Sequence, residues 1–138
     1  MTVEIPTPPE ISRLLKSSIL SIEELEVLLR LRADRVARRP SELADTLSIP
    51  ESIAESALAS LARAGFLAAI DQGKHLVYTF APQSDELAAS VEGLVAYYQD
   101  HRMQVILTIS NNAIERLRHG VLERFSDAFR ISRGDKDG

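Results

Sequence analysis

Residues 40–80 read PSELADTLSIPESIAESALASLARAGFLAAIDQGKHLVYTF, and this stretch decides the fold. It contains two short helical patterns, each introduced by a proline, and then two apolar runs around the polar turn DQGK at 71–74. Proline suits the first turn of a helix, and a polar turn with glycine between apolar runs indicates a β-hairpin. We therefore predict a helix, a turn, a second helix and a hairpin, in that order.

Apolar residues at helical spacing define the inward face of each helix. They are Leu43, Ala44 and Leu47 in the first helix and Ile53, Ala54, Ala57, Leu58, Leu61 and Ala62 in the second. Gly65 stands where a helix commonly ends in a left-handed residue. In the hairpin, Leu76, Tyr78 and Phe80 alternate with Val77 and Thr79, so we expect one face on the core and one accessible face.

Two further helices are predicted before this stretch. Residues 10–20 place apolar side chains at helical spacing, and Ser21 with Glu24 forms a capping box that begins the next helix. Residues 1–9 contain three prolines, which remove backbone donors and disfavour helix. We therefore expect 1–9 to be a disordered lead and the folded chain to begin at about residue 10.

The C-terminal third is predicted to be helical. A long helix opens at Ser84 and runs to about Ser110, Asn111 and Asn112 form a break, and a second helical segment follows to about Ile131. The apolar stripe on these helices is too long for the small neighbouring unit to cover. We expect 83–131 to be a dimerisation or interaction region and 132–138 a disordered tail. The expected dimer contacts are Leu87, Val91, Leu94, Tyr98, Val105, Ile109, Phe125 and Phe129.

The length and composition of the chain limit the classes of protein to which it can belong. A chain of 138 residues fits one domain, and its net charge of −4 argues against strong non-specific nucleic-acid binding. The absence of cysteine removes disulfides, thiolate nucleophiles and sulfur-ligated metals. No apolar run approaches the roughly 20 residues of a membrane span. We expect a cytoplasmic protein without a membrane partner.

Neither catalysis nor metal binding has a sequence signature here. The chain has no glycine-rich phosphate loop and no G-x-S-x-G elbow, and its three histidines lie far apart. His75, His101 and His119 lack the short spacing that zinc ligands show. We expect a protein that is not an enzyme and that carries no cofactor or metal.

The predicted helix-turn-helix and hairpin resemble the winged helix-turn-helix superfamily of bacterial transcription regulators, which includes the MarR and ArsR groups. The likeness covers about residues 21–80. It is carried by Glu42-Leu43-Ala44, Leu47, Ala57-Leu58, Leu61, Ala64-Gly65-Phe66-Leu67 and the hairpin to Phe80. The resemblance implies a mainly α fold with a small β-hairpin, a winged domain over 10–82 and C-terminal dimerisation helices.

The resemblance also implies a DNA-binding site. Exposed positions of the helix at 50–64 would touch base edges, and the hairpin tip at 71–75 would touch phosphate or the minor groove. The candidate residues for nucleic-acid or partner binding are Arg38, Arg39, Ser41, Glu51, Ser52, Glu55, Ser56, Lys74 and His75. The implied function is that of a homodimeric transcriptional regulator.

The charges of these residues leave two interpretations open. Glutamate repels phosphate, and the second helix offers no Arg, Lys, Asn or Gln on its exposed positions to read bases. The arginines at positions 30, 32, 35, 38 and 39 are either a phosphate-contacting patch or a solvated helix end. The chain is thus either a DNA-binding regulator or a winged-helix adaptor that docks a protein partner and binds no DNA.

Overall fold

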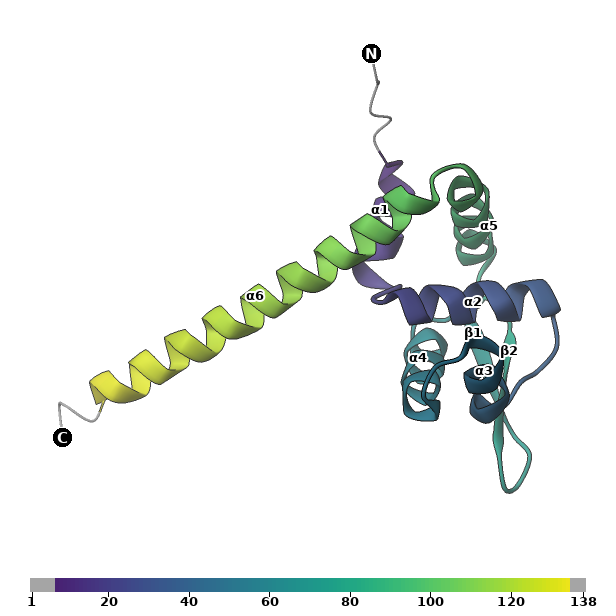
Figure 1. The fold of residues 1–138 in the computed structure, drawn as a ribbon, viewed down its shortest axis with the longest axis horizontal. Coiled ribbons are helices and arrows are strands. Elements are labelled where there is room, and N and C mark those ends of the chain that lie inside the picture. Colours follow the sequence, from purple (N-terminus) through teal and green to yellow (C-terminus); the bar gives the residue numbers. More distant parts are fainter. Residues whose placement is uncertain (1–6, 135–138) are drawn as a thin grey trace, which may run out of the picture.

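The computed structural model describes residues 7–134, with side chains described as far as residue 128. The elements in chain order are α1 (Pro9–Ser17), α2 (Ile22–Asp34), α3 (Pro40–Leu47), α4 (Glu51–Arg63), β1 (Leu67–Asp71), β2 (Leu76–Phe80), α5 (Asp85–Asp100) and α6 (Arg102–Gly134). In Figure 1, α3, α4 and the hairpin lie on one side of α2, and α1 and α5 lie on the other. The predicted mainly α fold with a small hairpin is confirmed.

Local signals place the helix ends close to the predicted positions. The Ser21 hydroxyl accepts a hydrogen bond from the Glu24 backbone N–H at 3.1 Å, as the capping box requires. Pro40 occupies the first turn of α3, and Gly65 after α4 has a φ of 94°. Only glycine adopts that conformation readily, so α4 ends there and the chain turns into β1.

The core is formed by α1, α2, α4 and the near parts of α5 and α6. Fully buried side chains include Leu28, Leu58, Leu61, Phe66 and Leu94. Ile53 was expected to face inward, but 41% of its surface is exposed. It lies near the start of α4, at the edge of the helix face that carries the buried residues.

The hairpin does not show the predicted alternation of burial. Val77 and Tyr78 are neighbours in sequence and are both buried, whereas Leu76 near the tip is 47% exposed. Arg38 forms a short antiparallel bridge with Tyr78: each backbone N–H donates to the other's carbonyl oxygen, at 2.9 and 2.8 Å. The segment before α3 thus covers the base of the hairpin, and burial follows distance from the core.

The C-terminal helices break at His101 and not at Asn111-Asn112, so the predicted position of the break was wrong. The His101 N–H donates to the Tyr97 carbonyl at 2.8 Å, and the Val105 N–H donates to the His101 carbonyl at 3.1 Å. The His101 ring stacks on Tyr97 with a centroid distance of 4.4 Å. His101 therefore ends α5 and begins α6.

Helix α6 continues through the two asparagines because Asn112 is used in tertiary contact. Its side-chain amide donates to the Leu15 carbonyl at 3.3 Å, and Arg116 one turn later donates to the Leu20 carbonyl at 2.7 Å. Both bonds satisfy carbonyls at and after the end of α1. Because α6 reaches Gly134, the tail predicted from residue 132 begins too early. Residues 1–6 and 135–138 lie outside the described residues.

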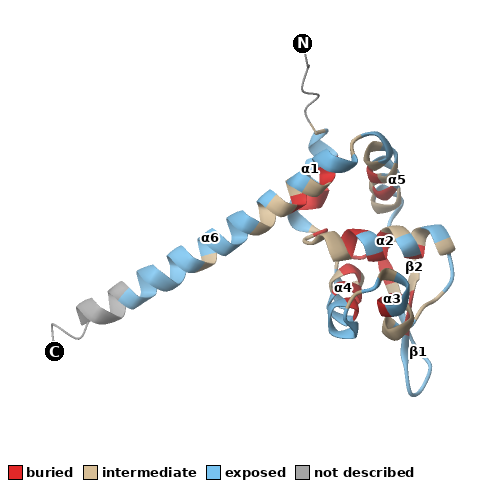
Figure 2. Ribbon diagram, viewed as in Figure 1, coloured by how far each residue is buried: buried red, intermediate tan, exposed pale blue. Residues whose placement is uncertain are grey.

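Most of the expected dimer contacts face the chain's own core, which corrects their assignment. Val91, Leu94, Val105 and Ile109 are buried, because α5 and the near half of α6 fold back on α1 and α2. Leu87 and Tyr98 are half-buried against the same core. Phe125 is exposed on the far part of α6, and the Phe129 side chain lies outside the described residues. Figure 2 shows the change from buried to exposed along α6.

Candidate nucleic-acid interface

An open groove of about 500 Å³ lies between the start of α3, the outer face of α4 and the hairpin. We call the hairpin, residues 67–80, the wing. The groove is lined by Arg39, Pro40, Ser41, Glu51, Glu55, Ala59, Lys74, His75, Leu76 and Tyr78. The fold thus brings six of the nine predicted site residues to one place: Arg39, Ser41, Glu51, Glu55, Lys74 and His75.

The helical period explains which residues of α4 reach the groove. Glu51, Glu55 and Ala59 are four residues apart and share one face of the helix. The side of α4 that packs on the core carries the buried Ala54, Ala57, Leu58 and Leu61. Ser52 and Ser56 are exposed but do not line the groove, and neither does Arg38. The predicted outer face of α4 is therefore exposed, and only part of it faces the wing.

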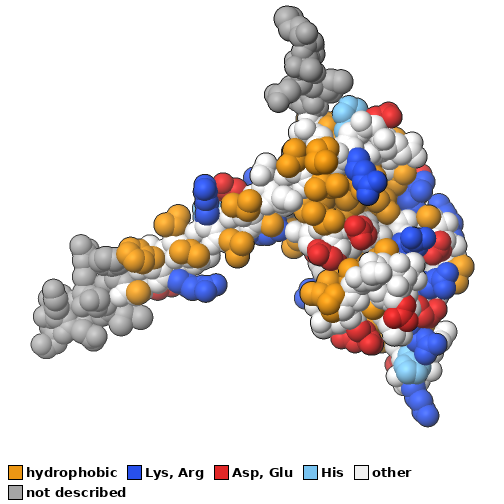
Figure 3. Space-filling view, in the orientation of Figure 1, with side chains coloured by type: hydrophobic (Ala, Val, Ile, Leu, Met, Phe, Trp, Pro, Cys, Tyr) orange, Lys and Arg blue, Asp and Glu red, His pale blue; other side chains and the backbone are white. Residues whose placement is uncertain are grey.

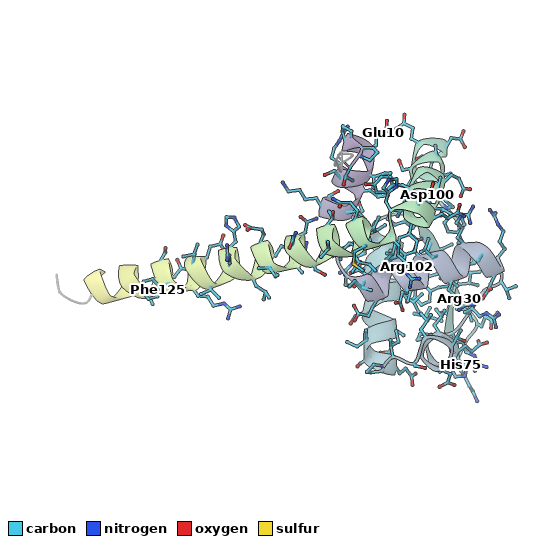
Figure 4. The ribbon with its side chains drawn as sticks, turned by 45° about the horizontal axis from the view of Figure 1, so that its top comes forward. Glu10, Arg30, His75, Asp100, Arg102 and Phe125 are labelled. Atoms are coloured by element: carbon cyan, nitrogen blue, oxygen red, sulfur yellow. The ribbon has the colours of Figure 1, made fainter. Side chains whose placement is uncertain are left out.

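The tip of the wing is held in shape by its own backbone. The Asp71 carboxylate accepts from the Gly73 N–H at 2.9 Å, and the Gln72 N–H donates to the His75 carbonyl at 2.9 Å. Gly73 takes a φ of 90°, which the tight turn requires. Lys74 and His75 are consequently exposed at a defined place beside the groove, and Figure 4 shows His75 at that end of the molecule.

The arginines before α3 are mostly engaged by groups of the chain itself. Arg32 binds Glu92 of α5 at 2.5 Å, and Arg38 lies 3.6 Å from Asp34 and 3.5 Å from Glu42. The Arg35 guanidinium lies over the Phe80 ring, 5.7 Å from its centroid. These contacts offset much of the positive charge that the sequence concentrates at 30–39.

Glu42 anchors the groove's edge at the start of α3. It accepts from the Arg39 backbone N–H at 3.1 Å and lies 3.4 Å from the Arg39 guanidinium. The backbone hydrogen bond, followed by those from the Arg39 and Arg38 side chains, lowers the pKa of Glu42 below its ordinary value. The carboxylate stays ionised at neutral pH, and Arg39 meets the groove as one half of an ion pair.

The groove therefore combines two carboxylates, two cations and a histidine. Glu51 and Glu55 face it from α4, and Arg39 and Lys74 face it from either end. Figure 3 shows blue and pale blue atoms at the tip of the wing and red atoms over the neighbouring helices. Such a surface gives a ligand both attractive and repulsive contacts, and it holds no excess of positive charge.

Two features of the site lay beyond sequence reasoning. Leu76 and Tyr78 line the groove, whereas the alternating pattern predicted only that one face of their strand would be accessible and did not place that face at a site. Arg32 and Glu92 are 60 residues apart, so no local signal joins them. Among the described side chains, those of residues 7–128, no cluster of histidine, aspartate and glutamate could hold a metal ion. No helix between residues 7 and 134 is long and apolar enough to cross a membrane.

No protein-family model and no curated protein sequence matches the chain. Solved structures do match it. A homodimeric winged helix-turn-helix DNA-binding domain from Mycobacterium bovis, described as a possible ArsR-family transcriptional regulator, is 15% identical, with a TM-score of 0.52. That match covers 72% of this chain and 93% of the other.

Two more solved structures extend the likeness over a larger share of the chain. A transcriptional regulator from Thermotoga maritima is 15% identical over 86% of this chain and 87% of its own, with a TM-score of 0.50. A variant of Staphylococcus aureus MepR bound to an oligodeoxyribonucleotide is 12% identical over 86% and 90%, also at 0.50. The suspected resemblance is confirmed at the level of fold: the chain has the winged helix-turn-helix fold that the M. bovis domain also has.

Proposed function

We propose that the protein is a cytoplasmic, homodimeric transcriptional regulator that binds DNA through α4 and the wing. The observation that carries this proposal is the groove, because it joins the exposed face of α4 to the basic tip of the wing. The similar MepR variant is bound to an oligodeoxyribonucleotide, and the similar M. bovis domain is homodimeric. Both properties are proposed here for this chain on the strength of the shared fold.

The dimensions of α4 suit the major groove of DNA. Its 13 residues span about 20 Å, and B-DNA offers a groove about 12 Å wide that admits a helix. In that position the hydroxyls of Ser52 and Ser56 face base edges, and Ser41 at the start of α3 donates to a phosphate. Lys74 and His75 then meet the backbone beside the groove. The wing acts as a clamp that fixes the register of α4.

The charges of α4 predict weak binding that depends on few cations. Glu51 and Glu55 oppose phosphate, so most counterion release must come from Lys74, Arg39 and the same residues of a second copy. Glutamate can accept a hydrogen bond from the amino group of cytosine. The two carboxylates therefore reduce general affinity and select for particular base pairs.

A second candidate function is a protein-docking adaptor that binds no DNA. The observation that favours it is the exposure of Glu51 and Glu55 beside arginines that the chain's own carboxylates engage. A partner segment rich in lysine or arginine would complement that face of α4. In this case the wing bounds the docking groove and contacts no phosphate.

The two candidates predict opposite effects of the same variants. We would titrate labelled genomic DNA fragments with the protein over a salt series and follow fluorescence anisotropy. For DNA binding, Lys74→Ala weakens affinity and lowers the salt slope by about 1, because one phosphate contact is lost. Glu55→Gln strengthens affinity because it removes a charge that repels phosphate. The matched control is Glu123→Gln on α6, far from the groove, which leaves affinity unchanged.

Absence of binding at the lowest salt concentration would overturn the regulator and leave the adaptor. The adaptor is tested with a labelled lysine-rich peptide under the same conditions. Glu51→Gln with Glu55→Gln then abolishes binding and Lys74→Ala preserves or strengthens it, because the partner is now positive. If the peptide and the DNA fragments both fail to bind, neither function belongs to this groove.

A further inference from the structure

The groove between α4 and the wing carries balanced charges when the ring of His75 is neutral. Glu51 and Glu55 supply two negative charges, and Arg39 and Lys74 supply two positive charges. The other side chains that line the groove are uncharged. A proton on His75 therefore changes the groove from neutral to positive.

Histidine is the residue type in this groove that responds to pH near neutrality. An imidazole ordinarily gains its proton at about pH 6.5. Glutamate ordinarily titrates at about pH 4.3, and lysine and tyrosine titrate at about pH 10. A change from pH 8 to pH 5.5 therefore acts on His75 and leaves the other lining groups in one charge state.

The ring of His75 is available to a ligand that enters the groove. The residue is exposed at the tip of the wing (Figure 4), and the hydrogen bond from the Gln72 N–H to its carbonyl at 2.9 Å holds its backbone in place. Among the described residues, no carboxylate forms an ion pair with the ring. The protonated ring therefore offers its N–H donors to a group that comes from outside the chain.

Three elements surround the ring with charged or titratable groups. These groups are Asp71, Lys74 and Tyr78 of the wing, Glu51 and Glu55 of α4, and Arg39 and Glu42 at the start of α3. Asp71 and Glu42 already accept backbone hydrogen bonds within their own elements, at 2.9 and 3.1 Å. Lys74 opposes a positive charge on the ring, and the two glutamates of α4 favour it. A DNA phosphate would act with the glutamates and favour the charged ring, and a cationic ligand would act against it.

We propose that His75 is a pH switch of the groove, and that its protonation strengthens DNA binding as the pH falls from 8 to 5.5. The proposal rests on the DNA binding of the proposed function and names a regulation of that same site. The imidazolium donates a charge-assisted hydrogen bond to a phosphate oxygen, and the proton comes from the solvent. The switch has the opposite effect on a lysine-rich partner, because the positive groove repels it.

The expected gain in affinity follows from counterion release. One phosphate contact contributes about 0.9 to the slope of log affinity against log salt, which corresponds to about eightfold in affinity at 0.1 M salt. A homodimer presents two wings, so the gain for both copies is about 60-fold. The salt slope at pH 5.5 should accordingly be steeper than the slope at pH 8 by about 1.8.

DNA titrations at two pH values test the switch. We would titrate labelled genomic DNA fragments with the full chain at pH 8 and at pH 5.5 over a salt series, with a label that does not titrate in this range. Wild type should bind about 60-fold more tightly at pH 5.5 in 0.1 M salt. His75→Gln should lose this dependence because its side chain stays neutral, and His75→Lys should lose it because its side chain stays charged. The matched control His119→Gln, exposed on α6 outside the groove, should keep it.

The two His75 variants also separate the charge of the side chain from its size. At pH 8, His75→Lys should bind DNA about 60-fold more tightly than His75→Gln. Equal binding by these variants, or a wild-type pH dependence in His75→Gln, would overturn the switch. Wild-type binding of equal strength at both pH values would also overturn it and would leave the proposed function standing. Absence of DNA binding at pH 5.5 and the lowest salt concentration would overturn both.

Discussion

Arg32 of α2 and Glu92 of α5 form a two-pronged ion pair. The arginine Nε and Nη2 donate to the two carboxylate oxygens at 2.6 and 2.5 Å. This pair ties the last turn of α2 to the middle of α5 across 60 residues of chain. It also engages Arg32, one of the arginines that the sequence suggested as contacts for DNA phosphates.

Glu92→Gln should make stability less sensitive to acid. The hydrogen bond from Arg32 lowers the pKa of Glu92, so its stabilising effect is present above the ordinary value of 4.5 and is lost as the pH falls through the depressed value. At pH 7 we expect a cost below about 1 kcal/mol, because the pair is partly exposed. Urea denaturation from pH 7 to pH 2 should show the difference from wild type shrinking to zero. A difference that persists at pH 2 would contradict this account, and Glu26→Gln, exposed on α2, is the control.

Alanine should have opposite effects at two glycines. At Gly65 the φ is 94° and a Cβ would lie 3.0 Å from the Gln83 Oε1, so Gly65→Ala should destabilise by more than about 1 kcal/mol. At Gly93 in α5 nothing lies within 4 Å of the added atom, so Gly93→Ala should stabilise by about 0.5–1 kcal/mol. Thermal melts of both variants check this, and a loss of stability at Gly93 would show that α5 has a further contact there.

The core and the outer face of α4 should respond differently to truncation. Leu58 is fully buried, and Leu58→Ala should cost about 2–5 kcal/mol through lost burial and a cavity. Ile53→Ala removes a side chain of similar size that is 41% exposed, and it should cost less, on the order of 1 kcal/mol. Urea denaturation measures both. Equal costs would mean that Ile53 is covered in solution.

Ser60→Ala should loosen α4 on α2. The Ser60 hydroxyl donates at 2.9 Å to the carboxylate of Glu24, which is only 7% exposed and also accepts from the Ser21 hydroxyl. Loss of a donor to a buried carboxylate should cost about 1–3 kcal/mol. Ser90→Ala is the matched control, since that hydroxyl bonds only to the Glu86 carbonyl of its own helix. If both variants melt alike, the contact between α2 and α4 contributes nothing measurable.

The winged unit could be predicted from sequence because its signals are local. Ser21, Pro40 and Gly65 each act within a turn of their own position, and each marks a helix end in the structure. The exposed face of α4 follows from its helical period. Glu55 and Lys74 come to one groove because the winged helix-turn-helix fold places the wing beside α4.

The C-terminal helices were predicted incorrectly because contacts between residues far apart in the sequence determine where the helices break and which face is buried. Asn112 in isolation favours a break, and only the Leu15 carbonyl, 97 residues away in sequence, makes it a good helical residue. Both faces of α6 carry apolar side chains, so periodicity alone could not say which face meets its own domain. Val105 was consequently expected at a second chain, whereas it lies in the core.

The backbone amide protons of Arg38 and Tyr78 can report on movement of the wing. Each of the two amide protons is held by the other residue's carbonyl, so both exchange with solvent only when the wing lifts from the segment before α3. The wing borders the groove, and the same two protons therefore record when the groove opens. Slower hydrogen–deuterium exchange at this pair after addition of a ligand would mark the wing closing on it.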